Sequence, residues 1–488
     1  MSYETKELFI AKPNKNVDTA TIQEGLVVLQ DFYMQKSEDG LSFKKRFGLS
    51  EVVNTGHNVQ GDGLYWFDSI DAFIYVINGR IYKMAQNYAL TDLTGDLLVT
   101  EQLVSFVEKS YGGINYLFMA NGGNVVYTNG TALTQKIASI TFNVSSIVNF
   151  NSYLIINRVG TNFWYYNLEG LSPGQTPFNW NLTQNIQAES NPDAIDALTV
   201  VNNRLYIWGK RSLETWYMDA SALVPFANLQ TSQVKEGVLS PYSIQVINKT
   251  QQVFLDENRR VRLLSEGRIL ELSKEYGRDI QAINNAIDSQ AFYMSLEGKS
   301  FYVMNFPEAN KTYLYDIDLN IWSELGYWES GTSTYSRFRG ITYGYSPRWN
   351  KHFLMDYQNG KIYTISSAYK DDNGNTINAY IETGSRTHGS NVWKRSKNLR
   401  AYIKTGVGKY NNPTSSPYIR LTHADNGSNT FSSVVNIDLG NTTSTTDDEV
   451  ILMRQGGRYR SRKYRIYAPD STDIVIFGLF EEIEYGHV

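Results

Sequence analysis

The chain has 488 residues, no cysteine and a formal net charge of -4 at pH 7. The lack of cysteine excludes disulfides, thiolate catalysis and cysteine-based zinc sites, and the acidic balance argues against a protein whose whole surface binds nucleic acid. Tyr, Phe and Trp make up 14% of the residues, and together with abundant Gly, Asn and Thr they favour strands joined by tight turns. We therefore expect an all-β protein.

Residues 1–55 are interpreted as an N-terminal arm. It holds a mostly apolar strand at 25–34 and the basic stretch Lys44-Lys45-Arg46 between two phenylalanines. The first residues, MSYETKELFIAKPNKN, lack a basic segment followed by an apolar one, and no run of about 18 apolar residues occurs in the chain. We expect neither an export signal nor a membrane span.

From residue 56 to 376 one unit recurs, made of an aromatic-rich strand, a turn of Asn, Gly or Asp, and a second strand. Successive copies start roughly 40 to 50 residues apart, which is the spacing of four-stranded propeller blades. The sequence therefore predicts a β-propeller of six or seven blades, the alternative being a large all-β chain with unevenly spaced hairpins. The copies lie at 73–82, 116–127, 153–166, 205–217, 253–263, 301–315 and 353–364.

From about residue 377 to 488 the pattern changes to longer strands without this unit. Seven strands in about 110 residues are typical of a β-sandwich, so we predict a C-terminal β-sandwich-like domain. Helices look scarce throughout, with one candidate at about 279–290.

The stretch 188–217 packs three short strands and two turns into thirty residues. Pro192 restricts φ, and Asp193 offers a side-chain acceptor to nearby backbone donors, so a turn is expected there. The pair Asn202-Asn203 tolerates the positive φ of a tight hairpin. The nearly continuous apolar residues of this stretch predict strands that are covered on both faces.

No motif of the sequence predicts catalysis, a cofactor or a metal. Gly170 to Gly174 reads GLSPG and matches a nucleophile elbow, but Pro173 has no N–H for the oxyanion hole. The five histidines are scattered without the spacing of metal ligands. A carbohydrate-cleaving propeller, which needs two converging carboxylates, stays open as the enzyme alternative.

Two basic clusters lie in the C-terminal part. The first is Lys394-Arg395 with Lys397 and Arg400. In the second, an extended conformation would place Arg458, Arg460 and Arg462 on one face and form a basic ridge. The ridge is interpreted as a subunit interface, a solvated face or a contact for DNA phosphates. Its residues are Arg454, Arg458, Arg460, Arg462, Lys463 and Arg465.

The central stretch resembles the tail hub proteins of short-tailed bacteriophages, which are also called packaged-DNA stabilisation proteins. Weaker similarities are Lys235 to Val238, the segment LSFKKRFGLS and the Arg-rich C-terminal strand. We interpret the matching residues as architectural rather than catalytic. They are Ala188, Glu189, Ser190, Pro192, Asp193, Glu214, Trp216 and Gly237.

This resemblance implies a structural protein of the virion tail that assembles in the host cytoplasm. The members of the tail hub family form a six-fold ring, a homo-oligomer beneath the head-to-tail adaptor or connector. The ring extends the DNA channel, retains packaged DNA with transient non-specific contact, and attaches tail fibres or spikes, as do the related nozzle proteins. The resemblance implies no cofactor and no enzyme activity. The alternative is a tail-associated carbohydrate-binding or glycan-cleaving β-propeller.

Overall fold

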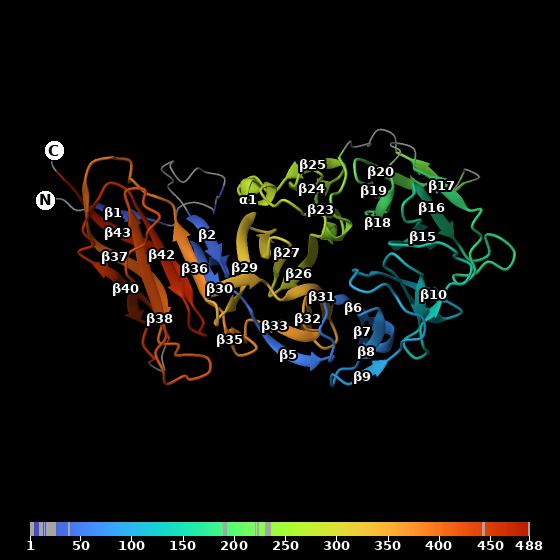
Figure 1. The fold of residues 1–488 in the computed structure, drawn as a ribbon, viewed down its shortest axis with the longest axis horizontal. Coiled ribbons are helices and arrows are strands. Elements are labelled where there is room, and N and C mark those ends of the chain that lie inside the picture. The colour runs from blue at the N-terminus through green and yellow to red at the C-terminus, as the bar shows by residue number, and fades with distance from the viewer. Residues whose placement is uncertain are drawn as a thin grey trace.

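The computed structural model describes residues 4–8, 13, 15, 26–37, 40–188, 193–219, 221, 224–229, 236–441 and 445–486. Nearly all regular elements in these residues are β-strands (Figure 1), and α1, Gly277–Gln281, is their one α-helix. The prediction of a helix over 279–290 is therefore wrong for most of that range, which forms turns and irregular chain. No helix in the described part of the chain is both long and apolar enough to cross a membrane.

Five separate four-stranded antiparallel sheets follow one another along the chain (Figure 1). In each of them the spatial order of the strands is their order in sequence, which is the arrangement of a propeller blade. Their strands are β6 (Gly61–Phe67), β7 (Ala72–Ile77), β8 (Arg80–Met84) and β9 (Leu90–Asp92); β10 (Ser105–Tyr111), β11 (Ile114–Ala120), β12 (Val126–Thr128) and β13 (Gln135–Lys136); β14 (Ile147–Phe150), β15 (Tyr153–Asn157), β16 (Phe163–Asn167) and β17 (Asn185–Gln187); β18 (Ile195–Val201), β19 (Arg204–Gly209), β20 (Leu213–Met218) and β21 (Phe226–Asn228); β22 (Gln245–Ile247), β23 (Gln251–Leu255), β24 (Val261–Ser265) and β25 (Arg268–Glu271).

Two more four-stranded units complete the ring as parts of larger sheets. One unit is β26 (Gln290–Leu296), β27 (Lys299–Phe306), β28 (Lys311–Asp316) and β29 (Ile321–Glu329). The other is β31 (Gly340–Ser346), β32 (Lys351–Asp356), β33 (Lys361–Ser366) and β5 (Gly48–Asn54). Strand β5 comes from the N-terminal part of the chain and pairs with β33, so it fastens the last blade to the start of the first. The described residues thus form a propeller of seven blades, within the predicted range.

The recurrent hairpins seen in the sequence are the two central strands of each blade. The tight turns of the blades use residues that the sequence singled out. Asn78 and Gly79, in the central hairpin between β7 and β8, have φ of 51° and 71°, and Asn202 and Asn203, between β18 and β19, have φ of 49° and 56°. Asparagine tolerates this left-handed region better than other side chains do, and it gives the tight turn that returns the strand onto its neighbour.

Two sheets pack face to face at the other end of the molecule, where both ends of the chain also lie (Figure 1). The β37 sheet contains β3 (Phe32–Ser37), β4 (Gly40–Lys45), β43 (Val475–Tyr485), β37 (Lys394–Thr405), β40 (Thr446–Arg454), β1 (Glu4–Glu7) and β41 (Arg458–Tyr459). The β42 sheet extends from β29 through β2 (Leu26–Gln30), β36 (Ala379–Thr383), β42 (Arg462–Ala468), β38 (Tyr418–Asp425) and β39 (Val435–Asp438). Apolar residues of both sheets, such as Phe43, Leu399 and Ile466, share one core.

The strands of the predicted arm, residues 1–55, join other parts of the molecule. Strands β1, β3 and β4 belong to the β37 sheet, β2 to the β42 sheet and β5 to the seventh blade. Short strands also pair at the junction, namely β30 (Thr334–Arg337), β34 (Asp371–Asp372) and β35 (Asn375–Thr376). Local sequence pattern does not reveal the pairing of β1 and β4 with β43, of β2 with β36 or of β5 with β33, because these partners lie hundreds of residues away.

Arg46 ties these sheets together from the link between β4 and β5. Its Nε donates to Asp31 Oδ1 at 2.6 Å, and its Nη1 and Nη2 donate to Asp372 at 2.9 and 2.5 Å. Nη2 also donates to the carbonyl of Gly326 in β29 at 2.8 Å. All three charged side chains are almost fully buried, so this cluster joins the propeller to the C-terminal sheets without exposing a charge.

Candidate functional site

The central motif lies in the fourth blade, where Asp193 fixes the turn between β19 and β20. Its carboxylate accepts hydrogen bonds from Arg211 N at 2.9 Å and Ser212 Oγ at 2.8 Å. A Cβ on Gly209 would come within 2.4 Å of Asp193 Oδ2, so glycine allows the carboxylate to approach. Ala188 is buried in the adjoining core, while Glu189, Ser190 and Pro192 lie outside the described residues.

Glu214, Trp216 and Gly237 make contacts within the same blade and with its neighbour. Buried Glu214 accepts hydrogen bonds from Trp216 Nε1 at 2.9 Å and Asn228 Nδ2 at 3.2 Å. The Trp216 ring packs edge-on against Trp164 of the third blade. A Cβ on Gly237 would lie 2.0 Å from the carbonyl of Lys210, so only glycine fits there. These residues build the blade and its contacts, and they do not converge on a pocket.

The predicted basic ridge is not a single face. Arg458 and Arg460 are exposed, but Arg462 is only 1% exposed, so its placement on the ridge is wrong. Its guanidinium forms two hydrogen bonds to Asp425 at 2.5 and 2.8 Å and lies over the ring of Tyr459. The chain breaks its strand pattern between β41 and β42, and this break turns Arg462 into the core.

The side chains of Lys463 and Arg465 lie on the outer side of β42 and contact other residues of the fold. Lys463 Nζ donates to Asn429 Oδ1 at 3.0 Å, and Arg465 Nε donates to Glu382 Oε2 at 2.8 Å. Both cations also lie over the ring of Phe431. These two residues are thus engaged within the fold, whereas Arg454 at the end of β40 is exposed.

The two basic clusters of the sequence meet in space. Strand β41 pairs with the start of β37, so Arg395 stands directly opposite Arg458. Both are exposed, and like charges at directly opposite positions destabilise a sheet. On the other side of β37, Arg395 is opposite Glu484. The excess positive charge makes an anionic partner favourable here.

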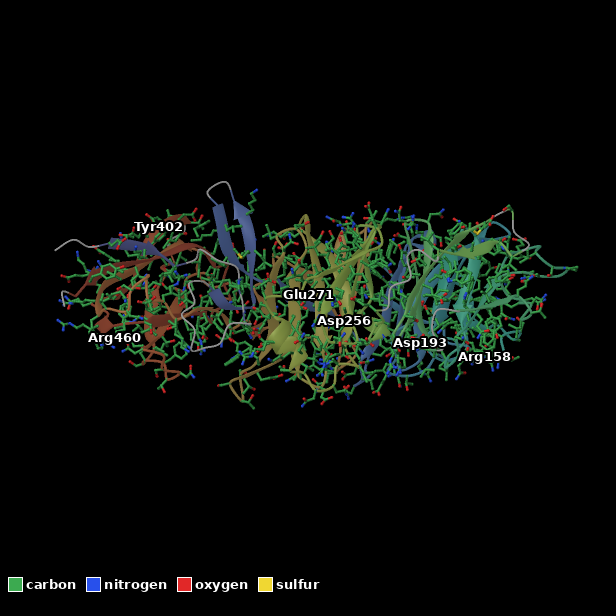
Figure 2. The ribbon with its side chains drawn as sticks, turned by 90° about the horizontal axis from the view of Figure 1, so that it is seen from above. Arg158, Asp193, Asp256, Glu271, Tyr402 and Arg460 are labelled. Carbon is green, nitrogen blue, oxygen red and sulfur yellow. The ribbon has the colours of Figure 1, made fainter. Side chains whose placement is uncertain are left out.

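Trp393 completes this surface, although no pattern in the sequence singled it out. Its side chain is 46% exposed, and the guanidinium of Arg460 lies 5.0 Å from its ring centroid. A cleft of about 660 Å³ is lined by Trp393, Arg395, Arg458, Glu484 and Tyr485 among others. Figure 2 places Arg460 in the C-terminal half, far from the labelled Asp193 and Arg158 of the propeller. We call Trp393, Arg395, Arg458 and Arg460 the Arg–Trp surface.

Comparison with known proteins identifies the propeller. Residues 47–370 match the family model described as Bacteriophage P22 Gp10, beta-propeller. The chain belongs to this family. The family is one of structural phage proteins, so the chain is a structural protein of the phage virion. The matched range ends before β36, which leaves the Arg–Trp surface outside it.

The solved structures that are similar to the chain share little sequence identity with it. The chain covers 99% of virginiamycin B lyase from Staphylococcus aureus with 66% of its own length, at 12% identity and a TM-score of 0.44. It covers 39% of the extracellular domain of the putative hybrid two component system BT4673 from B. thetaiotaomicron, again with 66% of its length, at 11% identity and a TM-score of 0.43. Identities this low carry no information on activity. No curated protein sequence matches the chain.

No metal centre accompanies these features: within the described ranges, no three or more His, Asp or Glu side chains gather as metal ligands do. The buried carboxylate of Glu481 in β43 is instead held by protein donors. Tyr464 Oη donates to Glu481 Oε1 at 2.5 Å, and His388 Nε2 lies 3.2 Å from Oε2. Burial by itself would raise the pKa of Glu481, but these hydrogen bonds hold it below its ordinary value.

Glu481 makes the C-terminal sheets sensitive to acid. Because its pKa is lower in the folded state, the unfolded chain binds the proton first, and the stabilisation is complete above the ordinary pKa of 4.5. It is lost as the pH falls through the folded pKa. We expect urea midpoints measured between about pH 3 and pH 7 to fall toward acid, and to fall less steeply in Glu481→Gln. If the urea midpoint fell equally with pH in the wild type and in Glu481→Gln, this role of Glu481 would be contradicted.

Proposed function

We propose that this chain is a subunit of a tail hub or nozzle. Several copies form a ring beneath the head-to-tail adaptor, and the family resemblance implies six. The ring extends the DNA channel, retains packaged DNA and attaches tail fibres or spikes. The match of residues 47–370 to a family of structural phage propellers is the observation that carries this proposal.

The Arg–Trp surface is the proposed contact between neighbouring subunits. Trp and Arg are enriched among the residues that carry most of the binding energy at protein interfaces. Trp393 is exposed beside three arginines, and the cross-strand pair Arg395 and Arg458 repel each other in the free subunit. Carboxylates from a neighbour would relieve that repulsion and form charge-assisted hydrogen bonds.

An acidic surface lies at the other end of β37, where this strand pairs with β40. Strands β37 and β40 pair from Asn398 opposite Arg454 to Thr405 opposite Thr446. Asp447 and Asp448 are exposed at the second end, and the cation opposite Asp447, Lys404, is bonded to Asp473 at 3.1 Å. Arg395, opposite Arg458, and Lys404, opposite Asp447, lie nine residues apart on β37. At roughly 3.3 Å per residue, the two surfaces are therefore about 30 Å apart.

This separation favours a head-to-tail contact. When a surface of one subunit binds a different surface of the next, the assembly closes into a ring if the rotation allows it. The Arg–Trp surface and the acidic end of β40 are two such different surfaces. The net charge of -4 suits a channel along which DNA slides with only transient contacts, because a strongly basic lumen would hold the phosphates.

The assembly state tests the proposal. Stable subunit contacts of this kind bury more than about 2,000 Å², so native mass spectrometry at micromolar concentration should find a closed oligomer of the full chain. An oligomer that forms only after the adaptor protein of the same virion is added would also agree. A chain that stays monomeric and binds no other virion protein contradicts the hub proposal.

A further inference from the structure

A second pocket lies in the propeller, far from the Arg–Trp surface. It has a volume of about 470 Å³ and lies where β32 and β33 separate. These strands pair only as far as Phe353 and Thr364. Beyond that point β32 continues beside β31 and β33 beside β5, which opens the end of the blade. The β32–β33 pocket is lined by Tyr88, Glu297, Asn350, Lys351, His352 and Thr364, among others.

His352 presents a hydrogen-bond acceptor in this pocket. The hydroxyl of Tyr343 donates its single proton to the carbonyl of Ser295 at 2.9 Å. Tyr343 Oη therefore accepts from His352 Nδ1, which lies 2.7 Å away, and this assigns the proton of the neutral ring to Nδ1. Burial lowers the pKa of His352, so the ring stays neutral at pH 7 and Nε2 keeps its lone pair.

Asn350 and Lys351 present donors in the same pocket. Asn350 Oδ1 accepts a hydrogen bond from Tyr345 Oη at 3.2 Å, which leaves the two amide protons of Asn350 for a ligand. Lys351 Nζ donates to Tyr88 Oη at 2.6 Å and lies 4.9 Å from the Tyr88 ring centroid. Each of these side chains is oriented by one partner in the protein and keeps a further hydrogen-bonding function.

The charges of the pocket balance, and its polar groups are mixed. Lys351 and Glu297 carry opposite charges, and both are exposed. Donors and acceptors lie beside the rings of Tyr88 and His352. Hydroxyl groups both donate and accept, whereas a phosphate would be repelled by Glu297 and an apolar ligand would leave these groups unpaired. The volume lies in the range of roughly 300 to 1,000 Å³ that is usual for small-ligand sites.

We propose that the β32–β33 pocket binds a neutral sugar unit of a polysaccharide. The apolar face of the sugar ring contacts the aromatic side chains, and its hydroxyl groups bond to Asn350, Lys351, His352 and Glu297. In most families of glycoside hydrolases, cleavage uses a pair of carboxyl groups, and Glu297 is the one carboxylate among the described residues that line the pocket. The site therefore binds glycan without hydrolysing it.

Glycan binding by the full-length chain tests the proposal. An array of neutral bacterial surface polysaccharides identifies the ligand, and titration calorimetry with an oligosaccharide of that polymer gives its affinity. Glu297→Gln and Lys351→Met each remove a charge-assisted hydrogen bond, so each should weaken the affinity about tenfold or more.

The chain offers closely matched controls in neighbouring blades. Glu266 has φ of 50° and precedes Gly267, as Glu297 has φ of 52° and precedes Gly298. Lys311 follows Asn310 at φ of 51°, as Lys351 follows Asn350 at φ of 49°. Glu266→Gln and Lys311→Met should leave the affinity unchanged. Failure to bind any neutral glycan, or equal binding by all four variants, overturns the proposal. Ring assembly does not depend on this pocket, so the hub proposal can fail or stand independently.

Discussion

Arg458→Glu is expected to prevent ring assembly while it stabilises the isolated subunit. Arg458 is directly opposite Arg395 across β41 and β37, and a glutamate there would turn a repulsive pair into an attractive one. The free energy of unfolding of the monomer should rise by about 0.2 to 1 kcal/mol. Assembly should be lost because the neighbour's carboxylates would meet a like charge. A purely structural role of Arg458 does not produce these opposite effects.

Native mass spectrometry and urea denaturation of the monomer measure the two effects. Arg268→Glu is the matched control, because Arg268 is exposed at the start of β25 in the propeller, and this variant should assemble normally. Arg460→Glu should also impair assembly with the fold intact by circular dichroism, since it removes the cation from the Trp393 ring. Assembly of both variants at wild-type levels would return the Arg–Trp surface to an ordinary solvated face.

The acidic end of β40 can be tested by charge exchange. If Asp447 of one subunit meets Arg458 of the next, the double variant Arg458→Glu, Asp447→Arg should recover part of the assembly that Arg458→Glu loses. Recovery by Asp447→Arg but not by Glu266→Arg would show that the two ends of β37 and β40 meet. Without recovery, the Arg–Trp surface would need a different acidic partner.

Arg46→Met should destabilise the protein by about 3 to 5 kcal/mol. The change leaves Asp31 and Asp372 buried without their cation, and breaking one side of a buried ion pair has a cost of this size. Because Arg46 bonds to β29, β34 and the link between β2 and β3, the loss should also separate the unfolding of the propeller from that of the C-terminal sheets. Urea denaturation followed by tryptophan fluorescence would then show two transitions.

Controls distinguish this effect from the loss of any arginine. Arg80 and Asp92 form an ion pair whose side chains are 49% and 47% exposed, so Arg80→Met should cost less than about 1 kcal/mol. Replacing Asp31 and Asp372 by asparagine together with Arg46→Met should recover part of the stability, because no buried charge would then remain. Equal stability of Arg46→Met and the wild type would contradict the role of this cluster.

Much of the fold could be predicted because its signals are local. In a blade hairpin such as β7 and β8, both strands and the Asn78-Gly79 turn lie within about a dozen residues of sequence. The longer strands after residue 377 were likewise visible as separate apolar runs. The number of blades and the closure of the propeller by β5 could not be predicted, because β5 pairs with β33 across more than three hundred residues.

The candidate site was harder to predict, because it depends on which side chains turn outward. The alternation of side chains along an extended strand placed Arg462 beside Arg458 and Arg460. The strand is interrupted between β41 and β42, however, and Arg462 is buried against Asp425. Trp393 looked like one aromatic residue among many. Its exposure and its contact with Arg460 arise only when β41 pairs with β37.

By itself, the order of residues determined an all-β, cysteine-free chain of repeated hairpins with two basic clusters, since each of these properties resides in neighbouring residues. The tertiary structure decided which strands close the propeller, which arginines stay exposed and where the β32–β33 pocket opens. These outcomes depend on strand pairing and burial between distant segments. The physical reason is that a side chain's partners, and thus its chemistry, are set by the register of strands that the local sequence does not encode.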